Sequence, residues 1–121
     1  MMDLDHFKVI NDTHGHQAGD RVLVEFAAKV QSRLRNKEML GRFGGEEFVV
    51  LLPNTPLDAA LQVAERIRAG CVPQGKEVGC TVSIGVTLGL PQGDSLDKML
   101  ARADAALYEA KNTGRNRVVV G

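Results

Sequence analysis

The sequence predicts an α+β fold, an α/β sandwich in which helices flank a mixed sheet. Three stretches of the 121-residue chain place apolar residues at helical spacing, and strand-like segments lie between them. Residues 48–52 are continuously apolar, which favours a strand covered on both faces, whereas residues 78–88 alternate between large apolar and small residues. A chain of this length is expected to form one domain that buries roughly two-thirds of its unfolded surface.

The three helices are expected over residues 17–35, over residues 56–70 and from Ser95 to Gly114, each with one apolar stripe. Thr55 has the side chain of a helix cap and stands directly before the second helix, as Ser95 does before the third. A glycine after the last periodic residue is a common end to a helix, and Gly114 occupies that place. The helices therefore have recognisable boundaries.

The strands are predicted from shorter signals. Residues 39–43 and 48–52 form an expected hairpin, because the glycine pair between them suits a tight turn with positive φ. A last short strand is expected over residues 117–120. A first strand that ends near Asp3 has only two residues before that position, fewer than the usual five or six, so we expect most of this strand to lie upstream of Met1.

Charge and cysteine content exclude several classes of function. Fifteen Lys and Arg residues balance 15 Asp and Glu residues, so no general attraction to nucleic acid polymers or to anionic membranes is expected. Cys71 and Cys80 form no CxxC pair and are expected to be reduced, partly buried thiols. The longest apolar run is too short to span a bilayer and no secretion signal is visible, so we expect a cytoplasmic domain.

Acidic residues gather at two places, Asp3 and Asp5 near the start and Glu46 and Glu47 in the hairpin turn. If the first strand lies beside the hairpin, these carboxylates converge. Crowded carboxylates share a proton or bind a hard divalent cation such as magnesium, which prefers a few carboxylates together with phosphate oxygens. The arrangement suits a nucleoside triphosphate site, although for Glu46 and Glu47 alone a solvated surface turn is the commoner outcome.

Three further groups of residues have two interpretations each. Lys8 lies in a short helix expected at the end of the first strand, where it could neutralise a phosphoryl oxygen or remain a solvated cation. Asn11 and Asp20 could select guanine, because a carboxylate accepts from both N1–H and the exocyclic amine, or they could cap helices. Lys111 and Arg115 lie four residues apart and could grip one anion, or they could complement the dipole of the third helix.

A zinc site is a weak alternative. His14 and His16 form an HxH pair, with His6 nearby, but no third and fourth ligand of the usual kind follows at close spacing. Both cysteines lie more than fifty residues downstream. Packing or ligand contact is the better interpretation of these histidines.

Five blocks of the sequence together resemble the GGDEF family, the diguanylate cyclases. The string GGEEF at residues 44–48 is similar to the family signature in one of its common forms, and residues 3–20 follow the pattern D-x-D-x-F-K-x-I-N-D-x-x-G-H-x-x-G-D at every fixed position. The strings TVSIGV, ADAALYEAK and GRNRV, in that order, resemble the later blocks of the family. The resemblance covers the chain from Asp3 nearly to its end.

The resemblance implies a palm-like sheet related to nucleotidyl cyclases, and the condensation of two GTP into cyclic di-GMP and two pyrophosphates. It assigns magnesium or manganese to the carboxylates of Asp3 and Glu46 and the carbonyl of Leu4. Glu46 would also accept the proton of the attacking 3′-hydroxyl, Glu47 would support the metal cluster, and Lys8 would stabilise the transition state. Nucleotide binding is assigned to five further residues, which are Asn11, His16 and Asp20 for the guanine nucleotide and Lys111 and Arg115 for the phosphates.

The resemblance also implies partners. Each domain would bind one GTP, so a homodimer of facing domains is needed, and a sensor domain is expected upstream. The family's N-terminal helix and most of its first strand are absent from residues 1–121, which we expect to be a single, N-terminally truncated GGDEF domain, with its shortened first strand internal to the sheet. The inhibitory RxxD motif of the family corresponds to Arg35 and Glu38, so this site is expected to be degenerate.

Two other classes of function stay open at this point. The chain could be a binding module that senses GTP or cyclic di-GMP without catalysis, which predicts nucleotide binding without product. It could also be a purely structural dimerisation element, which predicts no nucleotide affinity.

Overall fold

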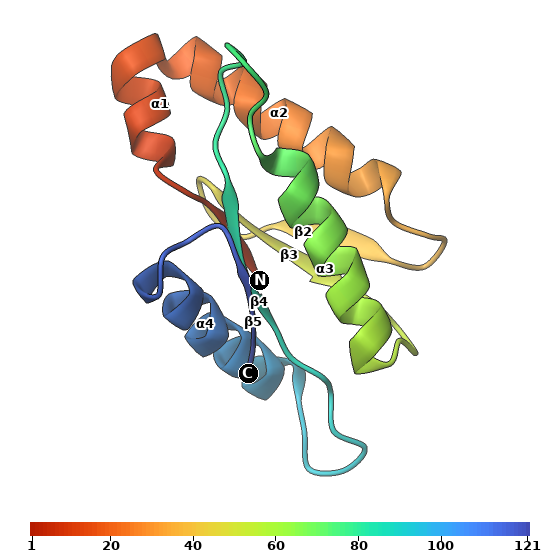
Figure 1. The fold of residues 1–121 in the computed structure, drawn as a ribbon. Coiled ribbons are helices and arrows are strands. Elements are labelled where there is room, and N and C mark those ends of the chain that lie inside the picture. The colour runs from red at the N-terminus through yellow and green to blue at the C-terminus, as the bar shows by residue number, and fades with distance from the viewer.

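A five-stranded mixed sheet forms the centre of the computed structural model, which describes residues 1–121 (Figure 1). The strand order is β2-β3-β1-β4-β5, with only β4 and β5 parallel. The elements in chain order are β1 (Met2–Leu4), α1 (Phe7–His14), α2 (His16–Ser32), β2 (Met39–Arg42), β3 (Glu47–Leu51), α3 (Leu57–Cys71), β4 (Val82–Val86), α4 (Leu96–Asn112) and β5 (Val118–Val120). The predicted α+β sandwich with a mixed sheet is confirmed.

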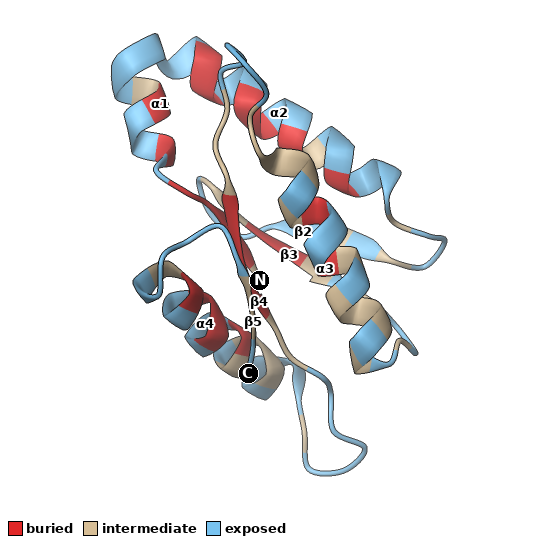
Figure 2. Ribbon diagram, in the orientation of Figure 1, coloured by how far each residue is buried: buried red, intermediate tan, exposed pale blue.

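The register of β1 divides the sheet into two faces. Met2 pairs with Phe48 and Ile84, and Leu4 pairs with Val82, so these apolar side chains share one face. They belong to the main core, which α1, α2 and α3 complete with Phe7, Ile10, Val22, Leu23, Phe26, Val30, Ala64 and Ile67. In Figure 2 the buried residues follow β1, β4 and the sheet-facing sides of these helices.

Helix α4 covers the opposite face of the sheet. Its buried residues are three alanines and Leu107, and a methyl group at Gly85 of β4 would collide with the backbone of this helix at Ala103 and Leu107. The small residues expected on one side of the 78–88 segment therefore do admit a close neighbour. The strand itself is shorter than predicted, Val82–Val86, and is buried on both faces.

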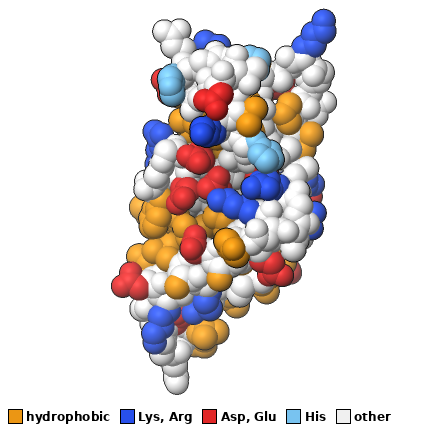
Figure 3. All heavy atoms as spheres, turned by 90° about the vertical axis from the view of Figure 1, so that its left-hand side faces the viewer, with side chains coloured by type: hydrophobic (Ala, Val, Ile, Leu, Met, Phe, Trp, Pro, Cys, Tyr) orange, Lys and Arg blue, Asp and Glu red, His pale blue; other side chains and the backbone are white.

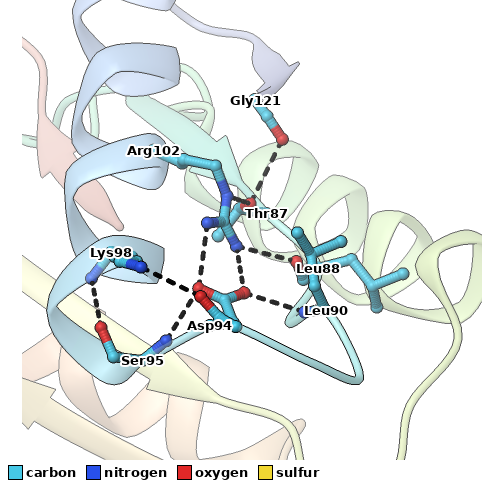
Figure 4. Close-up of polar contacts among 9 residues, drawn as sticks. Thr87, Leu88, Leu90, Asp94, Ser95, Lys98, Arg102 and Gly121 are labelled. Carbon is cyan, nitrogen blue, oxygen red and sulfur yellow. Dashed lines mark hydrogen bonds and ion pairs between the residues drawn. The ribbon is translucent and has the colours of Figure 1, made fainter.

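A polar network ties the loop after β4 to α4 (Figure 4). The Arg102 guanidinium donates to both carboxylate oxygens of Asp94, at 3.0 and 2.6 Å, and to Thr87 and the Leu88 carbonyl. Asp94 also accepts from the backbone N–H groups of Leu90 and Ser95. These bonds hold the pKa of Asp94 well below its usual range, with the Arg102 bond the largest cause.

Several boundaries and caps differ from the sequence predictions. The Ser95 cap of α4 is confirmed, because its hydroxyl accepts from the Lys98 amide. Thr55 as the cap of α3 is wrong, since Pro56 is the N-cap and the Thr55 hydroxyl donates to the Pro53 carbonyl instead. Helix α2 ends three residues before the predicted position 35.

The hairpin turn is also built differently from the prediction. Four residues, 43–46, connect β2 to β3, and neither glycine of the GG pair has a positive φ. The Arg42 side chain closes the turn by donating to the carbonyls of Gly44 and Gly45. A longer connection of this kind does not need the mirror-image backbone of a two-residue turn.

The remaining sequence expectations about burial are met in part. Cys71 and Cys80 are free and partly buried, and burial raises the pKa of their thiols to about 11 and about 12. In β3 only Phe48 and Val49 are buried, so the expected strand covered on both faces is realised over two residues. None of the helices has the length and apolar character that a bilayer crossing requires.

The contact at Gly85 predicts the effect of a single methyl group. Gly85→Ala should lower the free energy of unfolding by about 3 kcal/mol, because the helix backbone must retreat from the strand. Urea unfolding measures the difference. Gly41→Ala is the matched control, since no atom lies within 4 Å of the added carbon, and its effect should stay within about 0.5 kcal/mol. Equal effects at the two glycines would contradict the packing argument.

Candidate functional site

The sheet register brings the predicted acidic residues together. Asp3 of β1 stands directly opposite Glu47 of β3, and the Leu4 amide donates to the Glu46 carbonyl at 3.2 Å. Asp3 is buried, with 6% of its surface exposed, and both glutamates are half-buried. The prediction that the first strand lies beside the hairpin is confirmed, and so is its internal position in the sheet.

Asp3 lies on the same face of the sheet as α4, where it meets a cation. The Lys111 ammonium donates to Asp3 Oδ2 at 2.8 Å. Burial raises the pKa of the Asp3 carboxyl above its ordinary value, the Lys111 bond opposes this shift, and the charges of Glu46 and Glu47 add to it. The site therefore holds more negative charge than its one paired lysine balances.

The donors at this position are hard oxygen atoms. Magnesium is usually bound in proteins by one or two carboxylates, with substrate phosphates and water completing its octahedron. Asp3 and Glu46 supply two carboxylates of this kind, and their mutual repulsion is relieved when a divalent cation binds. No three His, Cys, Asp or Glu side chains converge into a cage made by protein alone. The donor set thus fits a cation that is shared with a phosphate ligand.

Helix α1 follows β1 directly and carries Lys8 in its first turn. Its N-cap residue is His6, which has a left-handed backbone with φ 55°, and no side chain caps this end of the helix. Lys8 is exposed. An uncapped helix start with a free lysine is suited to an anion, which is one of the two interpretations that the sequence leaves open for Lys8.

The residues expected to select guanine lie where α1 packs against α2. Asn11 is half-buried within α1, and its carboxamide oxygen occupies the space that a side chain at Gly19 of α2 would need. Asp20 follows Gly19 and is exposed, as is His16 at the start of α2. The capping alternative for Asn11 and Asp20 is wrong, because both lie inside helices whose N-caps are His6 and Gly15.

The two cations at the end of the chain are arranged differently from the prediction. Helix α4 ends at Asn112, so Lys111 and Arg115 are not one helical turn apart. Arg115 lies in the turn before β5 with φ 61°, a backbone conformation rare for a side chain of its kind, and its amide donates to the Ala110 carbonyl. Lys111 reaches Asp3, and Arg115 is exposed.

Asp5 belongs to the acidic residues near the start of the chain, and the sequence predicts no separate role for it. Its carboxylate is buried, with 3% exposed, and accepts from Thr81, Ser83 and the Asn116 amide. One feature of the sequence could have indicated these hydrogen bonds. Thr81 and Ser83 are hydroxyl residues among the small residues of the 78–88 segment, and hydroxyl groups in a buried strand need an acceptor.

Arg35 and Glu38, the expected inhibitory residues, lie in the exposed turn before β2. The Glu38 carboxylate accepts from the Arg35 backbone amide, and the Glu38 amide donates to the Arg35 carbonyl. The glutamate side chain is therefore engaged within the turn itself.

Charged side chains of both signs occur together on one side of the molecule. Acidic side chains lie beside Lys, Arg and His side chains on the side of the molecule that Figure 3 presents, which carries α1 and α4. The arrangement can bind a polyanion through its cations while its carboxylates bind a metal ion.

Comparison with known proteins identifies the family of the chain. Residues 1–117 match the family model described as "Diguanylate cyclase, GGDEF domain". The chain is 48% identical over 125 aligned positions to diguanylate cyclase A of Treponema denticola, covering 99% of this chain and 34% of that protein. It is 47% identical over 126 positions to the response regulator PleD of Caulobacter vibrioides, covering 98% of this chain and 28% of that protein.

Solved structures give the same result. The active GGEEF domain of a diguanylate cyclase from Vibrio cholerae superimposes with a TM-score of 0.91 at 36% identity, over 98% of this chain and 78% of that one. The GGDEF domain of DgcB from Caulobacter crescentus, in complex with c-di-GMP, has a TM-score of 0.90 at 35% identity, over 98% and 74%. The chain spans about a third of the length of the curated relatives it matches. It belongs to the GGDEF family of diguanylate cyclase domains.

Proposed function

We propose that this chain condenses two molecules of GTP into cyclic di-GMP with release of two pyrophosphates. The observation that supports this most directly is the pairing of Asp3 with the Glu46–Glu47 turn, beside Lys111. Carboxylates and cations grouped in this way would hold a nucleoside triphosphate together with a divalent metal ion. Diguanylate cyclases are among the most similar relatives.

The chain's own residues have separate roles in this reaction. The carboxylates of Asp3 and Glu46 and the Leu4 carbonyl would hold magnesium or manganese, which when bound neutralises the triphosphate and lowers the pKa of the attacking hydroxyl. Glu46 accepts the proton of the 3′-hydroxyl, and Glu47 keeps the local potential negative. Lys8, Lys111 and Arg115 bind phosphate oxygens.

The reaction needs two domains. In each half, a 3′-oxygen forms a bond to the α-phosphorus of the other nucleotide, the bond from that phosphorus to the bridging oxygen breaks, and pyrophosphate leaves. Each domain holds one GTP, with Asn11, His16 and Asp20 at the guanine end. Holding the two nucleotides in line, in a homodimer of facing domains, provides most of the rate acceleration.

Product inhibition is proposed to differ from that of relatives with an intact RxxD motif. Glu38 is already bonded to the Arg35 backbone amide, so it must break that bond to contact a ligand. Arg35 is exposed and remains able to bind a guanine base.

The proposed activity is tested directly with the purified chain, alone and fused to a parallel dimeric coiled coil that brings two domains together. Incubation with GTP and MgCl2 should yield one cyclic di-GMP for every two pyrophosphates, measured by chromatography and mass spectrometry. GTP binding without product from either form would instead indicate a binding module, and no nucleotide affinity would indicate a structural element.

Glu46→Gln should lower turnover at least about 100-fold, because the amide can neither accept the proton nor bind the metal ion as a carboxylate does. The fold should be retained, since the Glu46 carbonyl still accepts from Leu4. Glu109→Gln, the same chemical change at an exposed position of α4, is the control and should keep full turnover. Comparable rates in the two variants would contradict the assignment.

Gly19→Ala should weaken GTP binding about fivefold, the loss expected for one hydrogen bond, because the new methyl group displaces the Asn11 carboxamide. The change in stability should be small, because alanine favours the helix and this offsets the slight shift required of the Phe7 ring, whose Cζ lies 3.1 Å from the added carbon. Calorimetric titration and thermal melting measure the two effects. The double variant with Asn11→Ala should bind no more weakly than Asn11→Ala alone, and additive losses would contradict this explanation.

The raised pKa of Asp3 predicts a pH effect on stability. The folded chain binds this proton more tightly than the unfolded chain does, so lowering the pH from 7 towards 4 should stabilise the wild type relative to Asp3→Asn. Urea unfolding at several pH values measures the difference. Magnesium with a non-hydrolysable GTP analogue should reduce it, because a bound cation favours the ionised carboxylate. Stability curves that stay parallel would contradict the electrostatic account.

A further inference from the structure

The Asp5 carboxylate is a buried anion that the proposed reaction leaves without a role. Ser83 donates to Oδ1 at 2.6 Å, and Thr81 and the Asn116 amide donate to Oδ2 at 2.7 and 3.0 Å. Only 3% of Asp5 is exposed, and none of the ion pairs of the chain includes it. The three donors are uncharged, and together they fix the orientation of the Asp5 carboxylate.

These donors join three separate segments. Asp5 follows β1 two residues after Asp3, and its own amide donates to the Thr81 carbonyl at 2.8 Å. Ser83 belongs to β4, and Asn116 belongs to the turn between α4 and β5. The carboxylate therefore fastens that turn to the strand that carries Asp3.

The turn between α4 and β5 has a left-handed backbone that must be stabilised by contacts with the rest of the chain. Arg115 and Asn116 are consecutive non-glycine residues with φ 61° and 47°, a conformation that persists only where surrounding contacts determine it. The Asn116 amide donates to Asp5, its side-chain oxygen accepts from Arg68 of α3 at 2.8 Å, and the Arg115 amide donates to Ala110. No hydrogen bond or ion pair engages the Arg115 guanidinium, so it is available to a ligand.

We propose that Asp5 is a positioning residue that holds Arg115 in place for the triphosphate. The inference rests on the proposed function, in which Arg115 binds phosphate. Under this proposal, β1 and the residue that follows it position both Lys111 and Arg115. Lys111 is held directly by the Asp3 carboxylate, and Arg115 is held two residues further along, through the amide of its neighbour Asn116.

The test compares two ligands that differ in their phosphates, a non-hydrolysable GTP analogue with magnesium and guanosine, by calorimetric titration of the whole chain. Asp5→Asn should lower the affinity for the analogue about tenfold and leave the affinity for guanosine within about twofold, as Arg115→Ala should. The double variant should bind the analogue no more weakly than Arg115→Ala, because both changes remove the same contact.

Asp94→Asn is the matched control. Asp94 is another carboxylate that accepts several hydrogen bonds, including two from backbone amides, but it lies in the loop before α4. Its loss should lower stability without changing the ratio of the two affinities. If Asp5→Asn does not fold, Thr81→Val removes one donor from the same oxygen as Asn116 and should lower the affinity for the analogue alone.

Each outcome separates this inference from the proposed function. If Arg115→Ala binds the analogue normally, the phosphate role of Arg115 is wrong and the inference falls with it. If Arg115→Ala weakens binding and Asp5→Asn or Thr81→Val does not, only the inference is overturned. Additive losses in the double variant, or equal losses for guanosine, would also overturn it, because they indicate a general structural effect.

Discussion

The site depends on a strand of three residues that lies between two longer ones. Met2–Leu4 bonds to β3 on one side and to β4 on the other, and its alternation sends Met2 and Leu4 into the core and Asp3 to the opposite face. The same register that buries the apolar residues therefore sets Asp3 opposite Glu47. A slip of one residue would exchange the faces and place a carboxylate in the hydrophobic core.

The negative charge gathered around Asp3 lowers the stability of the folded chain. A buried aspartate beside two glutamates and one lysine is costly to keep ionised, and the raised pKa of Asp3 expresses that cost. A bound cation and a triphosphate would change the balance, since each supplies the charge that the other lacks. Binding sites of this kind are commonly less stable when empty than a neutral arrangement of the same shape would be.

The sequence was sufficient for the parts that depend on local pattern. The three long helices, the Ser95 cap and the mixed sheet follow from apolar spacing and punctuation, and the Asp3–Glu46 region follows from the motifs. Thr55 is not the cap because α3 begins at Leu57, which puts Pro56 at the N-cap position and Thr55 one residue outside it. The left-handed turn at Arg115 and Asn116 is held by tertiary contacts of Asn116 with Arg68 and Asp5. The donors to Asp5 lie 76, 78 and 111 residues away along the chain. A local sequence pattern cannot predict contacts between residues so far apart along the chain.

The contact between Gly85 and α4 gives this helix an unusual mechanical property. Over residues 103–110 it lies against strand backbone with mainly alanines between, so few flexible side chains are present there to absorb a displacement. Lys111 is the residue after the buried Ala110, close to the C-terminal end of α4. A push on the exposed side of α4, where Tyr108 is 69% accessible, would therefore move the backbone that carries Lys111, whose ammonium group is bonded to Asp3.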